Sequence, residues 1–171
     1  LLNFTRLDAR EESFVPVNLN EVAEKVKEDY EISIAQKSAV INIDNLCTVE
    51  AAPLQMNQLV FNLLGNALKF SREDVPPVIN VQSKILSKEE VAAFSELDQN
   101  AEYCEIIFSD NGIGFNQQFA QKIFEIFQRL ETNAGAKGSG IGLAICKKIA
   151  LNHKGAIVAT GKVNEGARFD V

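Results

Sequence analysis

The stretch from Gln55 to Phe70, QMNQLVFNLLGNALKF, has two different faces when it is read as an α-helix. At about 100° per residue, its leucines and Val60 fall on one side, where a core would bury them. The other side carries a polar stripe of amides with one cation and no acid: Gln55, Gln58, Asn62, Asn66 and Lys69. The stretch therefore predicts a central helix whose polar face differs from an ordinary solvated surface.

The composition of this polar stripe allows two interpretations. Solvated helix faces usually mix Lys and Glu, whereas Asn is a poor helix former because its side chain competes for backbone hydrogen bonds. Amide oxygens gathered beside an ammonium group fit a metal-bound phosphate chain, because hard cations prefer oxygen ligands and phosphate attracts cations. A partly buried polar seam against another helix explains the stripe equally well.

Length and composition are those of one globular domain. The chain has 171 residues, of which 46% are hydrophobic and 23% charged, enough for a substantial core. Its net charge of −6 argues against a nucleic-acid partner, which requires a basic patch. No apolar run is long enough for a membrane helix, and no signal peptide is recognisable. We expect Cys47, Cys104 and Cys146 to be reduced core residues, because they are far apart and lie on apolar stretches.

Hydrophobic periodicity and turn residues give the order of the elements. Residues 1–7 read as the end of a helix, followed by a linker. Helices are predicted over 19–37, 53–71, 87–97, 119–130 and 141–151, and strands over 40–43, 47–49, 78–85, 103–109, 156–160 and 167–171. This order predicts an α+β fold, a two-layer α/β sandwich. Its mixed, mostly antiparallel sheet would have about five strands, with three main helices on one face.

A carboxylate directly follows a predicted buried strand, in Asp110-Asn-Gly112-Ile-Gly114. Such a carboxylate could accept hydrogen bonds from an exocyclic amine, for example that of adenine, and glycines would let backbone approach a flat ring. A turn in which Asp110 caps its own backbone is the simpler alternative, and the motif taken alone favours it.

A second glycine cluster, Gly138-Ser-Gly140-Ile-Gly142-Leu143, opens the predicted helix 141–151. Glycines before a helix N-terminus expose N–H groups that can bind phosphate. A dinucleotide-binding motif and a P-loop both fail to fit, because the spacing is GxGxG, no strand precedes it and no Lys-Ser or Lys-Thr follows. The small residues within 128–137 favour a lid over phosphates.

The order of these pieces is more specific than any one of them. The chain resembles the ATP-binding catalytic domain of sensor histidine kinases, in the superfamily of DNA gyrase B, Hsp90-type chaperones and MutL. Four boxes carry the resemblance, which covers about 14–171: NLLGNALKF (62–70), DNGIGF (110–115), IFEIF (123–127) and GSGIGLAI (138–145). The resemblance implies a Bergerat-type ATP-binding fold that binds ATP and Mg²⁺.

The resemblance also implies roles for individual residues. Asn66 would ligate Mg²⁺ with Asn62 beside it, and Lys69 would contact phosphate; these three are the implied catalytic residues. Phe70 would lie near the adenine or ribose, and Asp110 would hold the adenine amino group. The remaining nucleotide contacts would come from Gly112, Gly114, Arg129, Gly138, Ser139, Gly140, Ile141, Gly142 and Leu143. Phe124 and Phe127 would anchor the lid, and a role in the core explains them equally well.

The implied reaction is transfer of the γ-phosphoryl group of ATP to a histidine. Asn62 stands where ATP-hydrolysing members of the superfamily typically carry a Glu that activates water. This difference favours a kinase over the first alternative, an ATP-hydrolysing clamp. A second alternative, a degenerate and non-catalytic nucleotide-binding module, is disfavoured because all four boxes keep their polar residues.

The resemblance implies that the phosphorylated histidine lies outside this chain. The single histidine, His153, occupies a place where the family often has a histidine that is not the acceptor. Residues 1–13 resemble the end of a dimerisation and phosphoacceptor hairpin with its linker, and residues 14–171 would be the catalytic domain. The implied partners are that upstream domain and a response-regulator receiver domain, in a homodimer. The location would be cytoplasmic, with membrane anchoring of the full-length protein left open.

Three features depart from the family pattern. Ala52 stands where an Asp usually precedes the helix of the first box. This difference would loosen the start of that helix. Arg168 precedes Phe169 at a position where a Thr is common. Since that Thr helps to close the adenine side of the pocket, this difference would lower the affinity for adenine. Residues 87–100 form a longer connection than usual, with no assigned function.

Overall fold

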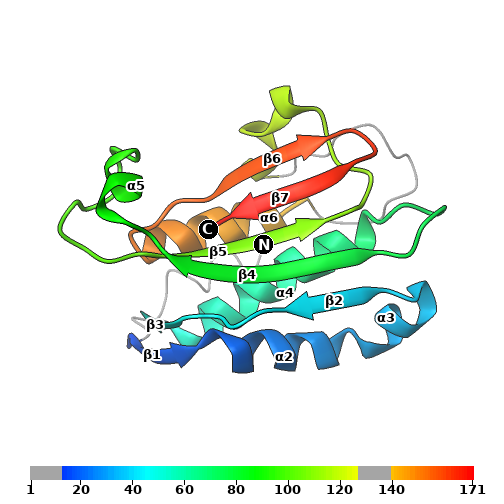
Figure 1. Ribbon diagram of the computed structural model, residues 1–171, viewed down its shortest axis with the longest axis horizontal. Coiled ribbons are helices and arrows are strands. Elements are labelled where there is room, and N and C mark those ends of the chain that lie inside the picture. Colours follow the sequence, from blue (N-terminus) through cyan, green and yellow to red (C-terminus); the bar gives the residue numbers. More distant parts are fainter. Residues whose placement is uncertain (1–12, 127–139) are drawn as a thin grey trace.

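The computed structural model describes residues 13–126 and 140–171 (Figure 1). Its helices are α2 (Leu19–Asp29), α3 (Glu31–Lys37), α4 (Pro53–Lys69), α5 (Lys88–Ala92) and α6 (Gly142–Asn152). Its strands are β1 (Val15–Asn18), β2 (Val40–Ile43), β3 (Thr48–Ala51), β4 (Val78–Ile85), β5 (Cys104–Asp110), β6 (Val158–Lys162) and β7 (Gly166–Asp170). No helix in these two ranges is long and apolar enough to cross a membrane.

A five-stranded sheet in the order β2-β4-β5-β7-β6 forms one layer of the domain. The β2–β4 pair is parallel and the other three pairs are antiparallel. Helices α4 and α6 lie behind the sheet and α2 lies along its β2 side, while no helix of residues 13–126 or 140–171 covers the front face of the sheet (Figure 1). The predicted α+β sandwich with a mixed, mostly antiparallel sheet is therefore confirmed.

The core lies between α4 and the sheet. The apolar face of α4 is buried as its periodicity predicted, with Leu59, Leu63 and Leu64 at most 2% exposed. Alternate residues of the central strands, among them Ile79 and Phe108, face the helices and are also buried. Helix α4 contacts α2 on one side and α6 on the other, so it is the element around which the layers assemble.

The segment predicted as one helix over 19–37 forms two helices, separated at Tyr30. The ring of Tyr30 stacks on Phe61 of α4 with 4.8 Å between centroids, and its hydroxyl donates to the Phe61 carbonyl. Gly65 provides the space, since a Cβ there would collide with the Tyr30 hydroxyl. Burial raises the pKa of Tyr30 to about 12, with a further contribution from Asp29. The break in the helix thus lets Tyr30 dock on α4.

The local structure differs from the sequence analysis at two other places. No strand was predicted around Pro16, where β1 pairs with β3 in a separate two-stranded sheet. A proline fits this edge strand because it needs no donor on its open side. The helix expected over 119–130 is replaced, up to residue 126, by two 3₁₀ turns, Gln117–Phe119 and Lys122–Phe124. The rest of that segment and the proposed domain boundary within residues 1–13 lie largely outside the described residues.

The prediction of three reduced cysteines was wrong for two of them. Cys47, in the loop before β3, forms a disulfide with Cys104, the first residue of β5. The two residues are 57 positions apart, so only the tertiary fold brings them together. Cys146 is a free, fully buried thiol, and burial raises its pKa to about 12.

Candidate functional site

The polar stripe of α4 has a different partner at each end. At its beginning, Gln55 is buried and its Oε1 accepts a hydrogen bond of 3.1 Å from Asn152 Nδ2, near the end of α6. This contact is the polar seam between helices that the sequence left open as an alternative. The seam interpretation is therefore correct for the first turn of α4.

The middle of the stripe meets the beginning of α6. Gln58 Nε2 donates to Asn62 Oδ1 at 3.3 Å, which fixes the Asn62 side chain from one turn earlier. A Cβ at Gly142, the first residue of α6, would lie 3.6 Å from Asn62 Oδ1. The Nδ2 atom of Asn62 is buried and makes no hydrogen bond of ordinary geometry among the described residues, but the Asn62 side chain interacts with the Cys146 thiol and opposes the rise in the pKa of that thiol. Asn62 therefore lies at the contact between α4 and α6, with its Oδ1 near Gly142.

Within the described part of the chain, the N-terminus of α6 has no side-chain cap. Its N-cap residue Ile141 gives no side-chain cap, and the first backbone bond of the helix runs from Ile145 N to Ile141 O. The preceding N–H groups therefore lack helical partners and can bind an anion. Gly140, just before them, has φ of 67°, a left-handed conformation that favours glycine. Ile141 and Leu143 are half-buried and pack against the core.

The last turns of α4 carry the remaining residues of the stripe. The half-buried Asn66 side chain makes no hydrogen bond within the described part of the chain. The Lys69 ammonium group is exposed and lies 4.6 Å from the centroid of the Phe70 ring, which is 37% exposed. An amide, an ammonium group and an aromatic ring are thus available at one end of the helix.

Asp110 ends β5 beside this end of α4. Its Oδ1 accepts the N–H of Gly112 at 2.8 Å, so the predicted side-chain turn is confirmed. Burial raises the pKa of Asp110, and backbone N–H groups of Gly112 and Ala167 act in the opposite direction. A carboxylate with these properties lies in a largely desolvated position, where a hydrogen bond to a ligand would be strong.

The glycines after Asp110 let the loop approach other backbone segments. A Cβ at Gly112 would lie 2.5 Å from the Phe70 carbonyl oxygen, which also accepts the N–H of Ile113 at 2.9 Å. Gly114 has φ of 59°, and a Cβ there would collide with the carbonyl of Lys162. The loop is therefore fixed against the end of α4, which places Asp110 next to Phe70.

Asn111 supports this loop, a role that the sequence analysis missed. Its Oδ1 accepts the N–H of Val78 at 2.8 Å, and its Nδ2 donates to the Pro76 carbonyl at 3.1 Å. These two bonds join the loop to the start of β4. The only signal in the sequence was its position between Asp110 and Gly112.

His153 has a structural role at the other end of α4. Its Nε2 accepts the N–H of Ala52 at 3.1 Å, and its Nδ1 lies 2.8 Å from the Ile149 carbonyl, to which it donates. Its ring stacks on Phe14 with 4.6 Å between centroids. Ala52 is the N-cap residue of α4 and has no side-chain oxygen that could cap the helix. The hydrogen bond from Ala52 to His153 therefore stabilises the start of α4, where the sequence predicted a loosened helix end.

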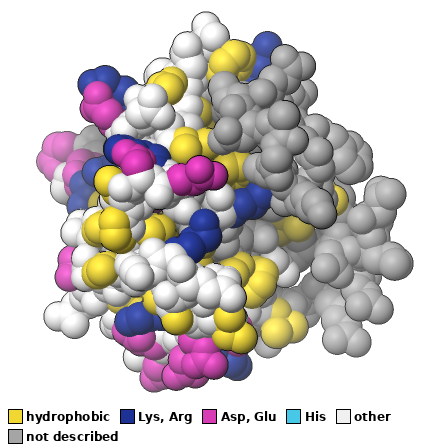
Figure 2. Space-filling view, turned by 90° about the vertical axis from the view of Figure 1, so that its right-hand side faces the viewer, with side chains coloured by type: hydrophobic (Ala, Val, Ile, Leu, Met, Phe, Trp, Pro, Cys, Tyr) yellow, Lys and Arg dark blue, Asp and Glu magenta, His cyan; other side chains and the backbone are white. Residues whose placement is uncertain are grey.

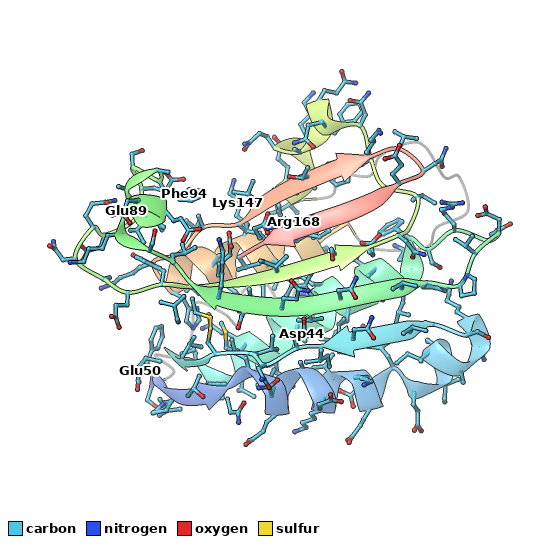
Figure 3. The ribbon with its side chains drawn as sticks, viewed as in Figure 1. Asp44, Glu50, Glu89, Phe94, Lys147 and Arg168 are labelled. Atoms are coloured by element: carbon cyan, nitrogen blue, oxygen red, sulfur yellow. A yellow bond between two sulfur atoms is a disulfide. The ribbon has the colours of Figure 1, made fainter. Side chains whose placement is uncertain are left out.

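Arg168 lies away from this site. In β7 it pairs with Ser109, whereas its neighbour Ala167 pairs with Asp110. Because side chains alternate between the faces of a strand, Arg168 points to the face opposite Asp110, where it binds Asp170 at 2.7 Å (Figure 3). The departure at Arg168 therefore does not bear on the pocket beside Asp110.

The site is therefore built from α4, the start of α6 and the loop after Asp110. Asn62 of α4 contacts Gly142 of α6, and Phe70 at the end of α4 contacts Gly112 of the loop. Figure 2 views the end of the molecule where α4 and β5 finish, and Lys and Arg side chains lie near the centre of that face. No group of three or more His, Cys, Asp or Glu side chains suited to a metal is present among the described residues. A cation bound here would be coordinated by amide oxygens of the chain and by oxygens of a bound small molecule. Phe127, Arg129, Gly138 and Ser139 lie outside the described residues.

Comparisons with known proteins agree with this arrangement. A family model described as histidine kinase-, DNA gyrase B-, and HSP90-like ATPase matches residues 51–171. Cyanobacterial phytochrome A of Nostoc is 35% identical over 99% of the chain, and phytochrome-like protein Cph1 of Synechocystis is 31% identical over 99%. The chain spans 20% and 21% of these two relatives, about a fifth of their length.

Solved structures share the fold at lower identity. The catalytic domain of histidine kinase ThkA aligns with a TM-score of 0.70 and 24% identity, covering 92% of each chain. Full-length ShkA in complex with AMPPNP aligns with a TM-score of 0.73 and 24% identity, covering 99% of this chain and 33% of that one.

Proposed function

The chain belongs to the family of histidine kinase-, DNA gyrase B- and HSP90-like ATPases, and from this we propose that it is the catalytic domain of a two-component sensor histidine kinase. In this proposal it transfers the γ-phosphoryl group of ATP to a histidine on a dimerisation domain. The relatives support it, since one is named signal transduction histidine-protein kinase/phosphatase MprB, from Mycobacterium avium. The observation that carries the proposal is the position of the Asn62 amide, which Gln58 orients, beside the N-terminus of α6.

The donor set fits Mg²⁺ bound together with phosphates. Asn66 and Asn62 would hold the ion through their amide oxygens, and Gln58 keeps the Asn62 side chain oriented. When bound, Mg²⁺ neutralises charge that develops on the phosphates. Few protein ligands suffice, because Mg²⁺ keeps several waters and takes oxygens from its nucleotide.

The chain's own groups would position the nucleotide. The free N–H groups at the start of α6 and the Lys69 ammonium group would bind phosphate oxygens. Asp110 would accept a hydrogen bond from the adenine amino group, with Phe70 nearby. Phosphoryl transfer depends mainly on such positioning and charge stabilisation, which these residues would supply.

The absence of an acid from the α4 stripe favours transfer over hydrolysis. Hydrolysis would require a general base to activate water, and Asn62 cannot take up a proton at neutral pH. A histidine acceptor needs no such base, because an imidazole nitrogen already carries a lone pair. We therefore prefer the kinase to an ATP-hydrolysing clamp.

His153 is a poor candidate for the acceptor, because both of its ring nitrogens are engaged with backbone groups. The acceptor would belong to a dimerisation domain of the same protein, and the phosphoryl group would pass on to a response-regulator receiver domain. The full protein would act as a homodimer, and its need for ATP would place this domain in the cytoplasm.

Titration with a fluorescent ATP analogue, with and without Mg²⁺, tests the proposal. We expect binding that depends on Mg²⁺, a loss of the Mg²⁺ effect in Asn66→Ala, and weaker binding in Asp110→Ala. Gln82→Ala, which removes an exposed amide from the other face of the sheet, is the matched control. Absent binding in the unmodified chain, or unchanged binding in both site variants, would contradict the proposal.

A second assay tests the transfer step. The domain is mixed with ATP and a separate dimerisation hairpin that bears a histidine, and labelled hairpin is measured. We expect weak transfer that Lys69→Ala reduces. Equal transfer by this variant would refute the role of Lys69.

A further inference from the structure

The Cys47–Cys104 disulfide lies at the end of the domain away from the nucleotide site. Cys104 begins β5 and Asp110 ends it, so the disulfide and the proposed adenine contact occupy opposite ends of one strand. The sulfur–sulfur bond lies at the beginning of β3 (Figure 3). Both cysteines are half-buried, unlike Cys146.

Cys104 lines a cavity of about 450 Å³. The walls of the cavity come from β3, the end of α6 and the 87–100 insertion, from which Phe94 and Leu97 contribute. Glu50 of β3 and Phe94 lie on opposite sides of it (Figure 3). Cavities that bind small molecules measure about 300–1,000 Å³, so this one can admit a small molecule to Cys104.

Ser83 makes the two sulfurs chemically different. Its Oγ accepts the backbone N–H of Cys47 at 2.8 Å and lies 3.1 Å from Cys47 Sγ. Because a disulfide-bonded sulfur carries no hydrogen, the Ser83 hydroxyl is the donor in this second contact. A thiolate at Cys47 would therefore be stabilised, which makes Cys47 the better leaving group in disulfide exchange.

We propose that Cys104 is a thiol-exchange site for low-molecular-weight thiols that enter through this cavity. The thiolate of the small molecule attacks Cys104 Sγ and forms a mixed disulfide. The bond to Cys47 breaks, and its electron pair stays on Cys47 Sγ, to which Ser83 donates. A second thiolate then attacks the sulfur of the bound small molecule, which releases the small disulfide and leaves a thiolate on Cys104. An oxidised small thiol reverses both steps.

Cys146 serves as an internal reference for this chemistry. It is 0% exposed and its Sγ faces the Leu59 carbonyl at 4.0 Å, inside the layer between α4 and α6. A small thiol cannot reach it without unfolding of the domain, so it should stay unmodified under conditions that modify Cys104.

Exchange is measured on the folded chain in buffers of reduced and oxidised glutathione, by acid quenching, alkylation and peptide mass spectrometry. We expect a reversible glutathione adduct on Cys104 and none on Cys146. Ser83→Ala should slow the first exchange step several-fold, whereas Ser109→Ala, on the outer face of β5, should not. Full reduction should lower the melting temperature by about 10 °C, because a cross-link between distant residues is lost.

Three results would overturn the proposal. The disulfide could resist exchange until the domain unfolds, which would make it a static cross-link. Both thiols could stay free in oxidised glutathione. The adduct could form first on Cys47, which would reverse the assignment of the attacked sulfur.

Discussion

At the scale of single residues, Asp110 is held in a position that favours its neutral form. Burial raises its pKa, so the folded state binds the proton more tightly than the unfolded state. The stabilising effect of this proton is fully present below the unfolded pKa and is lost as the pH rises through the folded pKa. At neutral pH the ionised, buried carboxylate therefore reduces the free energy of unfolding.

Asp110→Asn should accordingly stabilise the nucleotide-free domain at neutral pH while weakening nucleotide binding. Its side-chain oxygen can still accept the Gly112 N–H, but it carries no charge. The gain over the unmodified chain should shrink as the pH falls through the pKa of Asp110, because both side chains are then neutral. Urea denaturation across that range measures the difference, and a gain that grows on acidification would contradict the argument.

His153→Ala should destabilise the domain by about 1–3 kcal/mol, because it leaves the buried Ala52 N–H without an acceptor. The free energy of unfolding in urea measures this loss. Leu151→Ala, on the exposed side of α6, is the control and should cost much less. A neutral His153→Ala would show that the hydrogen bond to the start of α4 is dispensable.

Sequence reasoning at this scale succeeded where a side chain acts within its own segment. The turn formed by Asp110 was foreseen, because its partner Gly112 lies two residues away. The roles of Asn111 and His153 were missed, because their partners lie 33 and 101 residues away. The proposed functional roles of Asn62, Asn66 and Lys69 stay predictions.

At the scale of elements, α4 packs against α2, and Tyr30, at the end of α2, contacts α4 beside Gly65. Alanine has a higher helix propensity than glycine by about 1 kcal/mol, but a Cβ at Gly65 would collide with the Tyr30 hydroxyl. Overpacking of this kind costs about 1–3 kcal/mol, so Gly65→Ala should destabilise the domain.

The cost of Gly65→Ala should be compared in the unmodified chain and in a Tyr30→Phe variant, which lacks the colliding hydroxyl. Without the hydroxyl, the nearest atom to the new Cβ is the ring carbon Cζ, at 3.1 Å, so much of the collision disappears. Gly65→Ala should therefore cost less in this background, and a double-mutant cycle of unfolding free energies measures the coupling. Additive effects would exclude the collision as the cause.

The elements themselves were predictable wherever one interaction dominated. The periodicity of α4 and the alternation of β4 gave both elements, because each buries one face against the core. The break at Tyr30 and the strand β1 depend on docking partners that are distant in sequence, so local pattern could not reveal them.

At the scale of the whole molecule, nucleotide binding should stabilise the fold. Ligand at about 100 times its dissociation constant adds about 2.7 kcal/mol, which corresponds to a rise in melting temperature of about 5–10 °C for a domain of this size. We expect such a rise with Mg²⁺-ATP in thermal denaturation, and a much smaller one in Asn66→Ala. An equal rise in both would place the bound nucleotide elsewhere.

Architecture was more predictable than covalent connectivity. The two-layer sandwich follows from the apolar faces of the helices and strands, which can be identified from the spacing of hydrophobic residues in the sequence. The Cys47–Cys104 bond depends on the meeting of a loop with a strand 57 residues later, and the apolar surroundings of both cysteines pointed to thiols instead.

The number of residues in helix α4 determines the distance and the orientation between the two ends of the site. Its first turn is fixed to α6 through Gln55 and Asn152, and its last turn is fixed to the loop after Asp110 through the Phe70 carbonyl. Each residue of a helix adds about 1.5 Å and turns the next side chain by about 100°. An inserted or deleted residue between these anchors would separate Asn62 from α6 and turn Asn66 toward another neighbour. The length of α4 is therefore constrained by its two anchors, to α6 and to the loop after Asp110.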